Sequence, residues 1–263
     1  MTYNTHWHHY LSVALLGGVL FGAGIADATS PSSDSDLTTR GPAGTVRVTP
    51  EPGTAAPVPA TLPAPASPRP LSFKVNYVYR PGGRGPLKSL VEGSVLNSGD
   101  HYKIQFTPAE DGYVYIFQVD SSKAIFQLFP MTSFGGVRVD NLNPVKGGVT
   151  YHLPAKDKSF KLDDTVGSET IVFLAFREPN RTLEQQYKEI INARLARDGA
   201  KASSLQTAMN ANFRTRGLAG IVDDPQKKTA TVPWTETESF TMPVQNLNDL
   251  CVDCVSMVTF EHR

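Results

Sequence analysis

The feature that most constrains the fold is a series of short segments in which apolar and polar residues alternate. From Leu71 to Tyr79 every second residue is apolar, and Pro81-Gly82-Gly83 ends the segment. A period of two is typical of a strand with one buried face. Further strands are predicted at His101–Thr107, Gly112–Asp120, Lys123–Phe129, Gly148–Leu153, Thr170–Arg177 and Val255–Glu261. Strands spaced this closely favour an antiparallel β-sandwich, immunoglobulin-like or related.

Two segments with helical periodicity interrupt the strand pattern. Apolar residues share one face of a helix in residues 182–198 and again in residues 203–214. Asn180 or Thr182 is placed to cap the first of these helices. We therefore expect a mainly β domain over residues 71–263, with a two-helix insertion before the last strands and both apolar stripes packed on the sheet.

The N-terminal segment predicts export. Leu11–Ile25 is apolar or glycine throughout, and Ala26-Asp27-Ala28 follows with the small-x-small pattern of a cleavage site. The apolar stretch is shorter than the roughly 20 residues of a membrane span. We expect residues 1–28 to be a signal peptide and the protein to be periplasmic or extracellular. Because no Lys or Arg precedes the apolar stretch, an uncleaved membrane anchor is the alternative.

Residues 29–70 have the composition of a linker. They contain ten of the 20 prolines of the chain and no aromatic residue. Such a segment buries too little surface to offset the entropy of ordering, so we expect it to be disordered. Pro/Ala runs favour extended polyproline II, which predicts a semi-rigid spacer.

The charge balance and the absence of local motifs exclude several functions. Lys and Arg together number 25, as do Asp and Glu, and there is no basic run, which argues against nucleic acid as the partner. The chain has no HExxH, GxSxG, P-loop or GxGxxG motif, so we expect no enzyme, cofactor or metal. A Ser–His–Asp triad assembled only in space stays open for His101, His152 or His262.

Three groups of residues are candidates for chemistry or binding. Cys251-Val252-Asp253-Cys254 admits a redox pair, part of a zinc site or a structural disulfide, and export favours the disulfide. Asp163, Asp164 and Glu169 carry the oxygen ligands of a calcium site but lack the spacing of an EF-hand, so a solvated turn is preferred. Aromatic residues that alternate along strands offer a binding platform or core packing, and we favour core packing. These aromatic residues are Tyr77, Tyr79, Tyr113 and Tyr115.

The order of several short motifs resembles a known family. The segment Ser98–Phe106 (SGDHYKIQF) is followed by Asp111–Phe117 (DGYVYIF), Phe129-Pro130, Tyr151–Pro154 (YHLP) and Gly167-Ser168-Glu169. This succession is similar to the bacterial "domain of unknown function 4384" family, over about residues 87–177. The resemblance implies a β-sandwich-like module found in exported or multidomain bacterial proteins. It implies no established activity and supplies no catalytic residue.

Together these patterns predict a non-catalytic interaction module of the bacterial cell envelope. The tether would let the β-domain reach an envelope protein or a surface polymer. Two alternatives stay open. One is a thiol–disulfide oxidoreductase using Cys251 and Cys254, and the other is a glycan-binding domain using the strand tyrosines.

Overall fold

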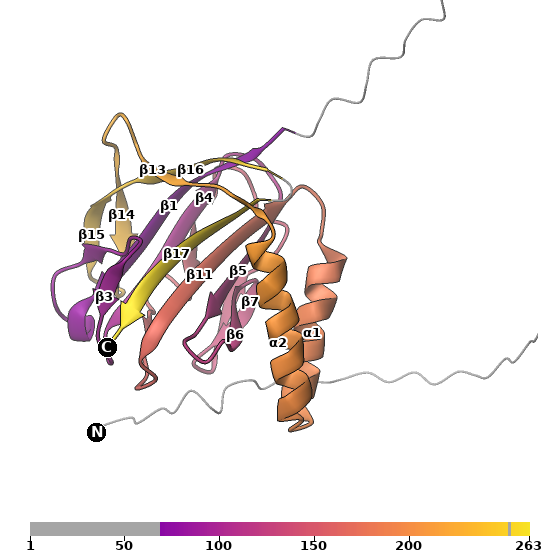
Figure 1. The fold of residues 1–263 in the computed structure, drawn as a ribbon. Helices are drawn as coiled ribbons and strands as arrows, with labels where there is room; N and C mark the ends of the chain where they lie inside the picture. The colour runs from indigo at the N-terminus through magenta and orange to yellow at the C-terminus, as the bar shows by residue number, and fades with distance from the viewer. Residues whose placement is uncertain (1–68, 252–253) are drawn as a thin grey trace, which may run out of the picture. The chain divides into compact units, whose positions relative to one another are not determined.

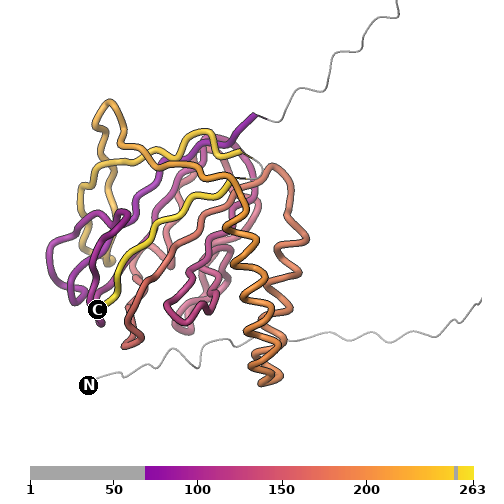
Figure 2. Tube along the Cα trace, viewed as in Figure 1, coloured from indigo at the N-terminus to yellow at the C-terminus, as the bar shows by residue number. Residues whose placement is uncertain are grey.

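The computed structural model describes residues 69–251 and 254–263. They form a mainly β domain in which two sheets pack face to face, with two helices after β11 and before the last strands (Figures 1 and 2). The predicted sandwich and its two-helix insertion are therefore confirmed. The predicted signal peptide and all but the last two residues of the predicted linker lie outside the described residues.

The larger sheet has the strand order β10–β4–β1–β16–β13, and β2 and β9 pair with β1 and β4. β1 is central and pairs antiparallel with β4 from Phe73 to Arg80. A single 3₁₀ turn, Pro81–Gly83, ends β1 where the sequence predicts a turn. The strands are β1 (Leu71–Arg80), β2 (Lys88–Ser89), β4 (His101–Pro108), β9 (Tyr151–Leu153), β10 (Phe160–Lys161), β13 (Ile221–Asp223) and β16 (Gln245–Leu250).

The smaller sheet has the order β12–β17–β11–β5–β6, with β3 also on β17. β11 is central and pairs antiparallel with β5 and β17. The short strands β3 and β12 run parallel to β17, which departs from the all-antiparallel expectation. The strands are β3 (Ser94–Leu96), β5 (Tyr113–Val119), β6 (Ile125–Phe129), β11 (Gly167–Phe176), β12 (Gly217–Leu218) and β17 (Cys254–His262).

Two helices cover the outer face of the smaller sheet (Figure 1). They are α1 (Arg181–Leu195) and α2 (Gly199–Arg214). The Asn180 side chain accepts a hydrogen bond from the Leu183 N–H at 3.0 Å, so the predicted cap is confirmed. Their buried residues join those of β5 and β11 in one hydrophobic cluster, separate from the cluster between the sheets.

Two hairpins complete the fold. β7 (Met131–Phe134) and β8 (Val137–Asn141) are joined at Gly135-Gly136, where the sequence predicts a turn. Both glycines have positive φ, which side chains disfavour. β14 (Thr229–Pro233) and β15 (Ser239–Pro243) form a hairpin that the sequence did not predict. Trp234, Val232 and Met242 of this hairpin pack on Val78, which lies on the outer side of β1.

Candidate functional site

The described chain enters the domain at the opposite end from its C-terminus. The Arg177 guanidinium donates two hydrogen bonds to the Arg69 carbonyl, at 3.1 and 2.7 Å, and pairs with the Glu110 carboxylate at 2.9 Å. β1 runs from this entry point to the far end of the sandwich, where β17 and the chain finish (Figure 1). We call that far end, built from residues 80–101, 120–124, 161–169 and 262–263, the distal end.

A chain of polar contacts joins both sheets at the distal end. The Tyr102 hydroxyl donates to Gln118 Oε1 at 2.6 Å, and Gln118 Nε2 donates to Glu169 Oε2 at 2.8 Å. His262 Nδ1 lies 3.7 Å from Glu169 Oε1, and His262 Nε2 lies 3.1 Å from Ser98 Oγ. We call these five residues the distal network. It connects a buried carboxyl to a hydroxyl on an exposed turn.

Burial dominates the electrostatics of this network. Glu169 and His262 are 2% and 1% exposed. Burial raises the pKa of Glu169 to about 7, and Asp120 and Asp163 add to the increase, while the Gln118 hydrogen bond and Lys123 oppose it. His262 Nδ1 is buried without a hydrogen-bond partner among the described residues. A buried polar atom without a hydrogen bond costs folding free energy, so the stability of the Glu169–His262 pair depends on which atoms carry its protons.

The backbone before Glu169 is set by a glycine. Gly167 has φ +133°, and a Cβ there would lie 2.6 Å from the Ser121 Cβ. The β5–β6 turn therefore packs directly on the start of β11, which a side chain at residue 167 would prevent. This close approach brings Asp120 near Glu169.

A small pocket of about 50 Å³ opens beside Glu169. Its lining residues are Tyr102, Gln118, Asp120, Phe126, Lys161, Leu162, Asp163, Thr165 and Glu169. Of the acidic residues considered for calcium, Asp163 and Glu169 line the pocket and Asp164 does not. Over residues 69–251 and 254–263, no group of three His, Cys, Asp or Glu side chains is placed to hold a metal ion.

Ser98, His262 and Glu169 have the order of contacts of a hydrolytic triad but not its surroundings. Acyl transfer needs backbone N–H groups that point at the developing oxyanion. In the turn that carries Ser98, the N–H groups of Ser98, Gly99 and Asp100 donate to the carbonyls of Arg263, Leu162 and Asn97, at 2.8, 3.1 and 2.9 Å. These three donors are already engaged, so the turn offers none of them to an oxyanion.

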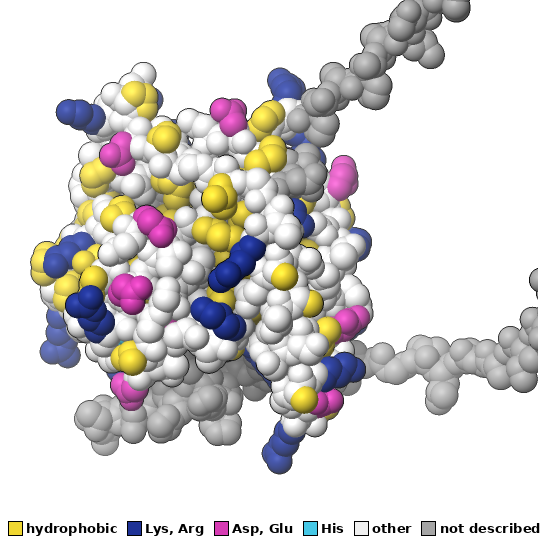
Figure 3. Space-filling view, viewed as in Figure 1, with side chains coloured by type: hydrophobic (Ala, Val, Ile, Leu, Met, Phe, Trp, Pro, Cys, Tyr) yellow, Lys and Arg dark blue, Asp and Glu magenta, His cyan; other side chains and the backbone are white. Residues whose placement is uncertain are grey.

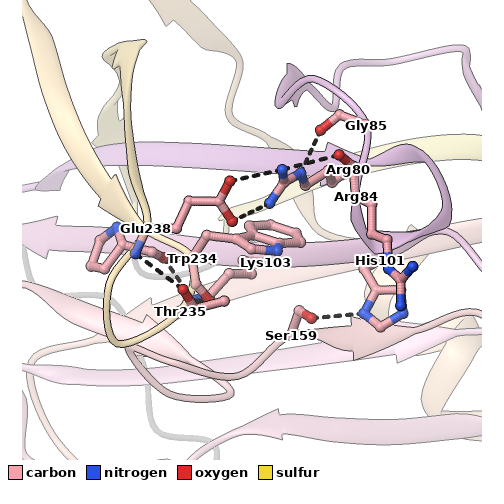
Figure 4. A network of polar contacts seen from close by, with 10 residues as sticks. Arg80, Arg84, Gly85, His101, Lys103, Ser159, Trp234, Thr235 and Glu238 are labelled. Carbon is pink, nitrogen blue, oxygen red and sulfur yellow. Dashed lines mark hydrogen bonds and ion pairs between the residues drawn. The ribbon is translucent and has the colours of Figure 1, made fainter.

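A second polar cluster fastens the β14–β15 hairpin to the larger sheet (Figure 4). Lys103 is 2% exposed, and its Nζ donates to the carbonyls of Lys156 and Pro233 at 2.5 and 2.7 Å. The Arg80 guanidinium pairs with both carboxylate oxygens of Glu238, at 2.5 and 2.8 Å. Trp234 lies beside both cations, with its ring centre 5.7 Å from Arg80 Cζ and 5.5 Å from Lys103 Nζ.

Lys103 and the two histidines of this region have pKa values lowered by burial. Burial lowers the pKa of Lys103 to about 8, against an opposing effect of Asp157. Burial, Lys103 and Lys156 lower the pKa of His152 to about 4, so this imidazole is neutral at neutral pH. Burial and Lys161 lower the pKa of His101, whose Nδ1 lies 2.8 Å from Ser159 Oγ. Because the charged ends of Lys103 and Arg80 are paired with groups of the hairpin, the cluster serves to hold the hairpin.

The two predicted cysteines are joined. Cys251 and Cys254 form a disulfide between the end of β16 and the first residue of β17. Cys254 therefore starts a strand, whereas redox cysteines of the thioredoxin type lie at a helix N-terminus.

The four candidate tyrosines pack into the two cores. Tyr77 and Tyr115 are 2% and 1% exposed. Tyr79 is partly buried against the cluster that contains Tyr77, and Tyr113 against the cluster that contains Tyr115. Tyr77 and Tyr79 lie between the sheets, and Tyr113 and Tyr115 lie beneath the helices. Core packing, the interpretation favoured from the sequence, is what the structure shows.

Sequence reasoning missed Ser98 and Glu169 as partners of His262. Ser98 and His262 are 164 residues apart, and no local pattern relates them. The one signal in the sequence that could have indicated the network was the acidic residue at position 169. Glu169 falls at an inward position of a strand otherwise rich in apolar residues, and there an acidic residue requires a polar partner.

Comparison with known proteins agrees with the predicted resemblance. The family model described as "Domain of unknown function (DUF4384)" matches residues 95–179. No curated protein and no solved structure matches the chain. No helix in the described part of the chain has the length and apolar character needed to cross a membrane. The match covers β4 to β11 and four residues of the distal network, namely Ser98, Tyr102, Gln118 and Glu169. It identifies residues 95–179 of this chain as a DUF4384 domain.

Proposed function

We propose that this protein is a non-catalytic interaction module of the bacterial cell envelope, exported to the periplasm or beyond and carried on the linker over residues 29–70. In this proposal the distal end binds an envelope protein or a surface polymer. The observation that carries it is the placement of chain entry and distal pocket at opposite ends of the sandwich. A tether attached at Arg69 leaves the pocket end free to meet a partner.

The character of the surface supports binding. The distal end combines the exposed charges of Lys161 and Asp163 with Val166, whose side chain is 56% exposed. The face in Figure 3 likewise shows charges of both signs among small hydrophobic patches. Reversible interfaces are about as apolar as the rest of a protein surface, and their charges steer and orient the partner, so this surface is compatible with binding.

Site-specific photocrosslinking in intact cells tests the proposal. A photoreactive residue at Asp163 is expected to capture a partner, whereas the same residue at the exposed Lys188 on α1 is not. Charge reversal at Lys161 should weaken the Asp163 crosslink several-fold, because a charge facing the partner is then inverted. Equal crosslinking from Asp163 and Lys188, or none from any distal position, would contradict the proposal.

A thiol–disulfide oxidoreductase is the second candidate, because Cys251 and Cys254 are paired. Insulin reduction measured with the wild type and with Cys251→Ser separates the two functions. Robust activity that the substitution abolishes would replace the interaction module with an enzyme. For the glycan-binding alternative, Tyr79 and Tyr113 are the candidates that keep accessible surface, because Tyr77 and Tyr115 are buried in the cores.

A further inference from the structure

We propose that Glu169 and His262 form a proton-linked pair that transmits the ionisation of a buried carboxyl to Ser98 at the surface, so that the distal end responds to pH. The geometry carries this inference. Two nearly fully buried side chains face each other at 3.7 Å, and the far nitrogen of the imidazole contacts the hydroxyl of an exposed turn. The inference goes beyond the proposed function and does not depend on which partner binds.

The hydrogen bonds of the network fix which oxygen of Glu169 carries the proton. Glu169 Oε2 accepts from Gln118 Nε2, and Gln118 Oε1 accepts from the Tyr102 hydroxyl. The amide of Gln118 is thereby oriented with its donor toward Glu169. A proton on the carboxyl therefore resides on Oε1, and the nearest group that can accept it is His262 Nδ1.

Two arrangements follow, and each gives the unpartnered His262 Nδ1 a hydrogen bond once the pair closes from the observed 3.7 Å. With Glu169 neutral, its Oε1–H donates to Nδ1, and His262 Nε2–H donates to Ser98 Oγ. With Glu169 ionised, Nδ1–H donates to Oε1, and Nε2 accepts from the Ser98 hydroxyl. Between the two, one proton passes from Oε1 to Nδ1 and one leaves Nε2 for solvent by way of Ser98. Ionisation thus reverses the direction of the Ser98 hydrogen bond.

Charged and titratable groups lie around Glu169 on several elements, and three of them, Asp120, Asp163 and Lys123, act on its carboxyl. Tyr102 lies on β4, Asp120 and Lys123 flank the β5–β6 turn, and Lys161 and Asp163 line the pocket from β10 and the segment after it. Asp120 and Asp163 favour the protonated carboxyl, and Lys123 favours the ionised form. Burial and Glu169 together raise the pKa of Tyr102, so this hydroxyl stays a donor throughout.

The ¹⁵N chemical shifts of the imidazoles test the proposal, because they distinguish Nδ1–H, Nε2–H and imidazolium forms. In the full chain titrated from pH 5.5 to 8.5, His262 is expected to change from the Nε2–H to the Nδ1–H tautomer as Glu169, whose pKa burial raises to about 7, loses its proton. In Glu169→Gln the carboxyl cannot ionise, so one tautomer is expected at every pH. His101 and His152, in the same spectra, are the internal controls.

Two further variants keep the test decisive if Glu169→Gln fails to fold. Asp120→Asn and Asp163→Asn each remove a negative charge that favours the protonated carboxyl, so each should move the His262 midpoint to lower pH. A wild-type His262 with one tautomer over the whole range would overturn the proposal. So would a transition that persists unchanged in Glu169→Gln, or a midpoint that neither Asp substitution moves.

Discussion

At the scale of single residues, Lys103 and Glu169 are both buried ionisable groups, but their polar atoms are satisfied to different degrees. Lys103 Nζ donates to two backbone carbonyls, that of Lys156 and that of Pro233 on the covering hairpin. Glu169 has one hydrogen bond, and its second oxygen faces an imidazole beyond bonding distance. A fully satisfied charge contributes to rigidity, whereas a partly satisfied one makes stability depend on pH.

Glu169 is expected to make the domain more stable in mild acid than at pH 8. Its folded pKa of about 7 lies above the ordinary value of 4.5, so the folded state holds the proton more tightly between these values. Stability from this group is therefore lost as pH rises from about 4.5 through about 7. At roughly 1.4 kcal/mol per pKa unit, the full difference is about 3 kcal/mol. Urea denaturation at pH 5, 6, 7 and 8 measures it.

In Glu169→Gln this part of the pH dependence should disappear. The exposed Asp164→Asn makes a comparable substitution outside the pocket lining and should keep the wild-type slope. A slope that survives in Glu169→Gln would show that other groups set the pH dependence.

At the scale of elements, the β14–β15 hairpin explains why β1 carries polar residues that are nonetheless buried. Asn76 and Arg80 fall on the outward side of β1, where alternation alone suggests exposure to solvent. The hairpin covers this side, and Asn76 Nδ2 donates to the Pro243 carbonyl at 2.5 Å. The polar face of the larger sheet is thus an attachment surface for the hairpin.

Lys103→Met should loosen this attachment. Methionine fills similar space but leaves the carbonyls of Lys156 and Pro233 without their buried donor, which costs about 1–3 kcal/mol. Chemical denaturation measures the loss, and hydrogen exchange should show faster exchange in residues 229–243 than in β11. The exposed Lys188→Met is the matched control and should change stability little. Equal losses in both variants would refute an attachment role.

The cap of α1 gives a second prediction at this scale. Asn180→Ala removes the acceptor of the Leu183 N–H and should lower the free energy of unfolding by about 1 kcal/mol. Asn180→Ser keeps a capping oxygen and should restore most of this loss. Thermal denaturation of the three proteins checks the order, and an alanine variant as stable as wild type would exclude the cap as a contributor.

At the scale of the whole molecule, the disulfide joins the two sheets. Cys251 follows β16 of the larger sheet, and Cys254 begins β17 of the smaller one. The double substitution to Ser should lower stability by about 2 kcal/mol, because the entropic benefit of a loop this short is small. Comparing denaturation midpoints of oxidised wild type and the double variant measures this. A loss above about 5 kcal/mol would point to a larger structural role.

Much of the architecture was predictable because its strands are long and alternate clearly. β1, β4, β5 and β11 have periods that the sequence shows directly, and Asn180 identifies the start of α1. The strands that were missed are mostly short, as β2, β10 and β12 with two residues each are, and carry too few side chains for a period. β14 and β15 also alternate polar and apolar residues, but each has only five residues and ends in a proline. Val78, apolar on an outward position, was the local sign of a covering element.

The candidate site was much less predictable. Its geometry depends on the register of β11 against β17 in the smaller sheet, which pairs Glu169 with Phe260 and Gly167 with His262. Ser98 enters through the turn after β3, a three-residue strand that runs parallel to β17. Residue types can suggest that a buried Glu needs a partner, but the partner follows only from the fold.

The central position of β1 has a mechanical consequence. Hydrogen bonds join β1 to β4 over residues 73–80 on one side and to β16 over residues 71–75 on the other. Tension applied through Arg69 while the distal end is held acts along β1, perpendicular to these bonds. Both rows are then loaded together in shear, and Arg177 shares the load at the entry point. The first strand is thus arranged to resist extraction by a pulling force with two rows of hydrogen bonds, where an edge strand would have one.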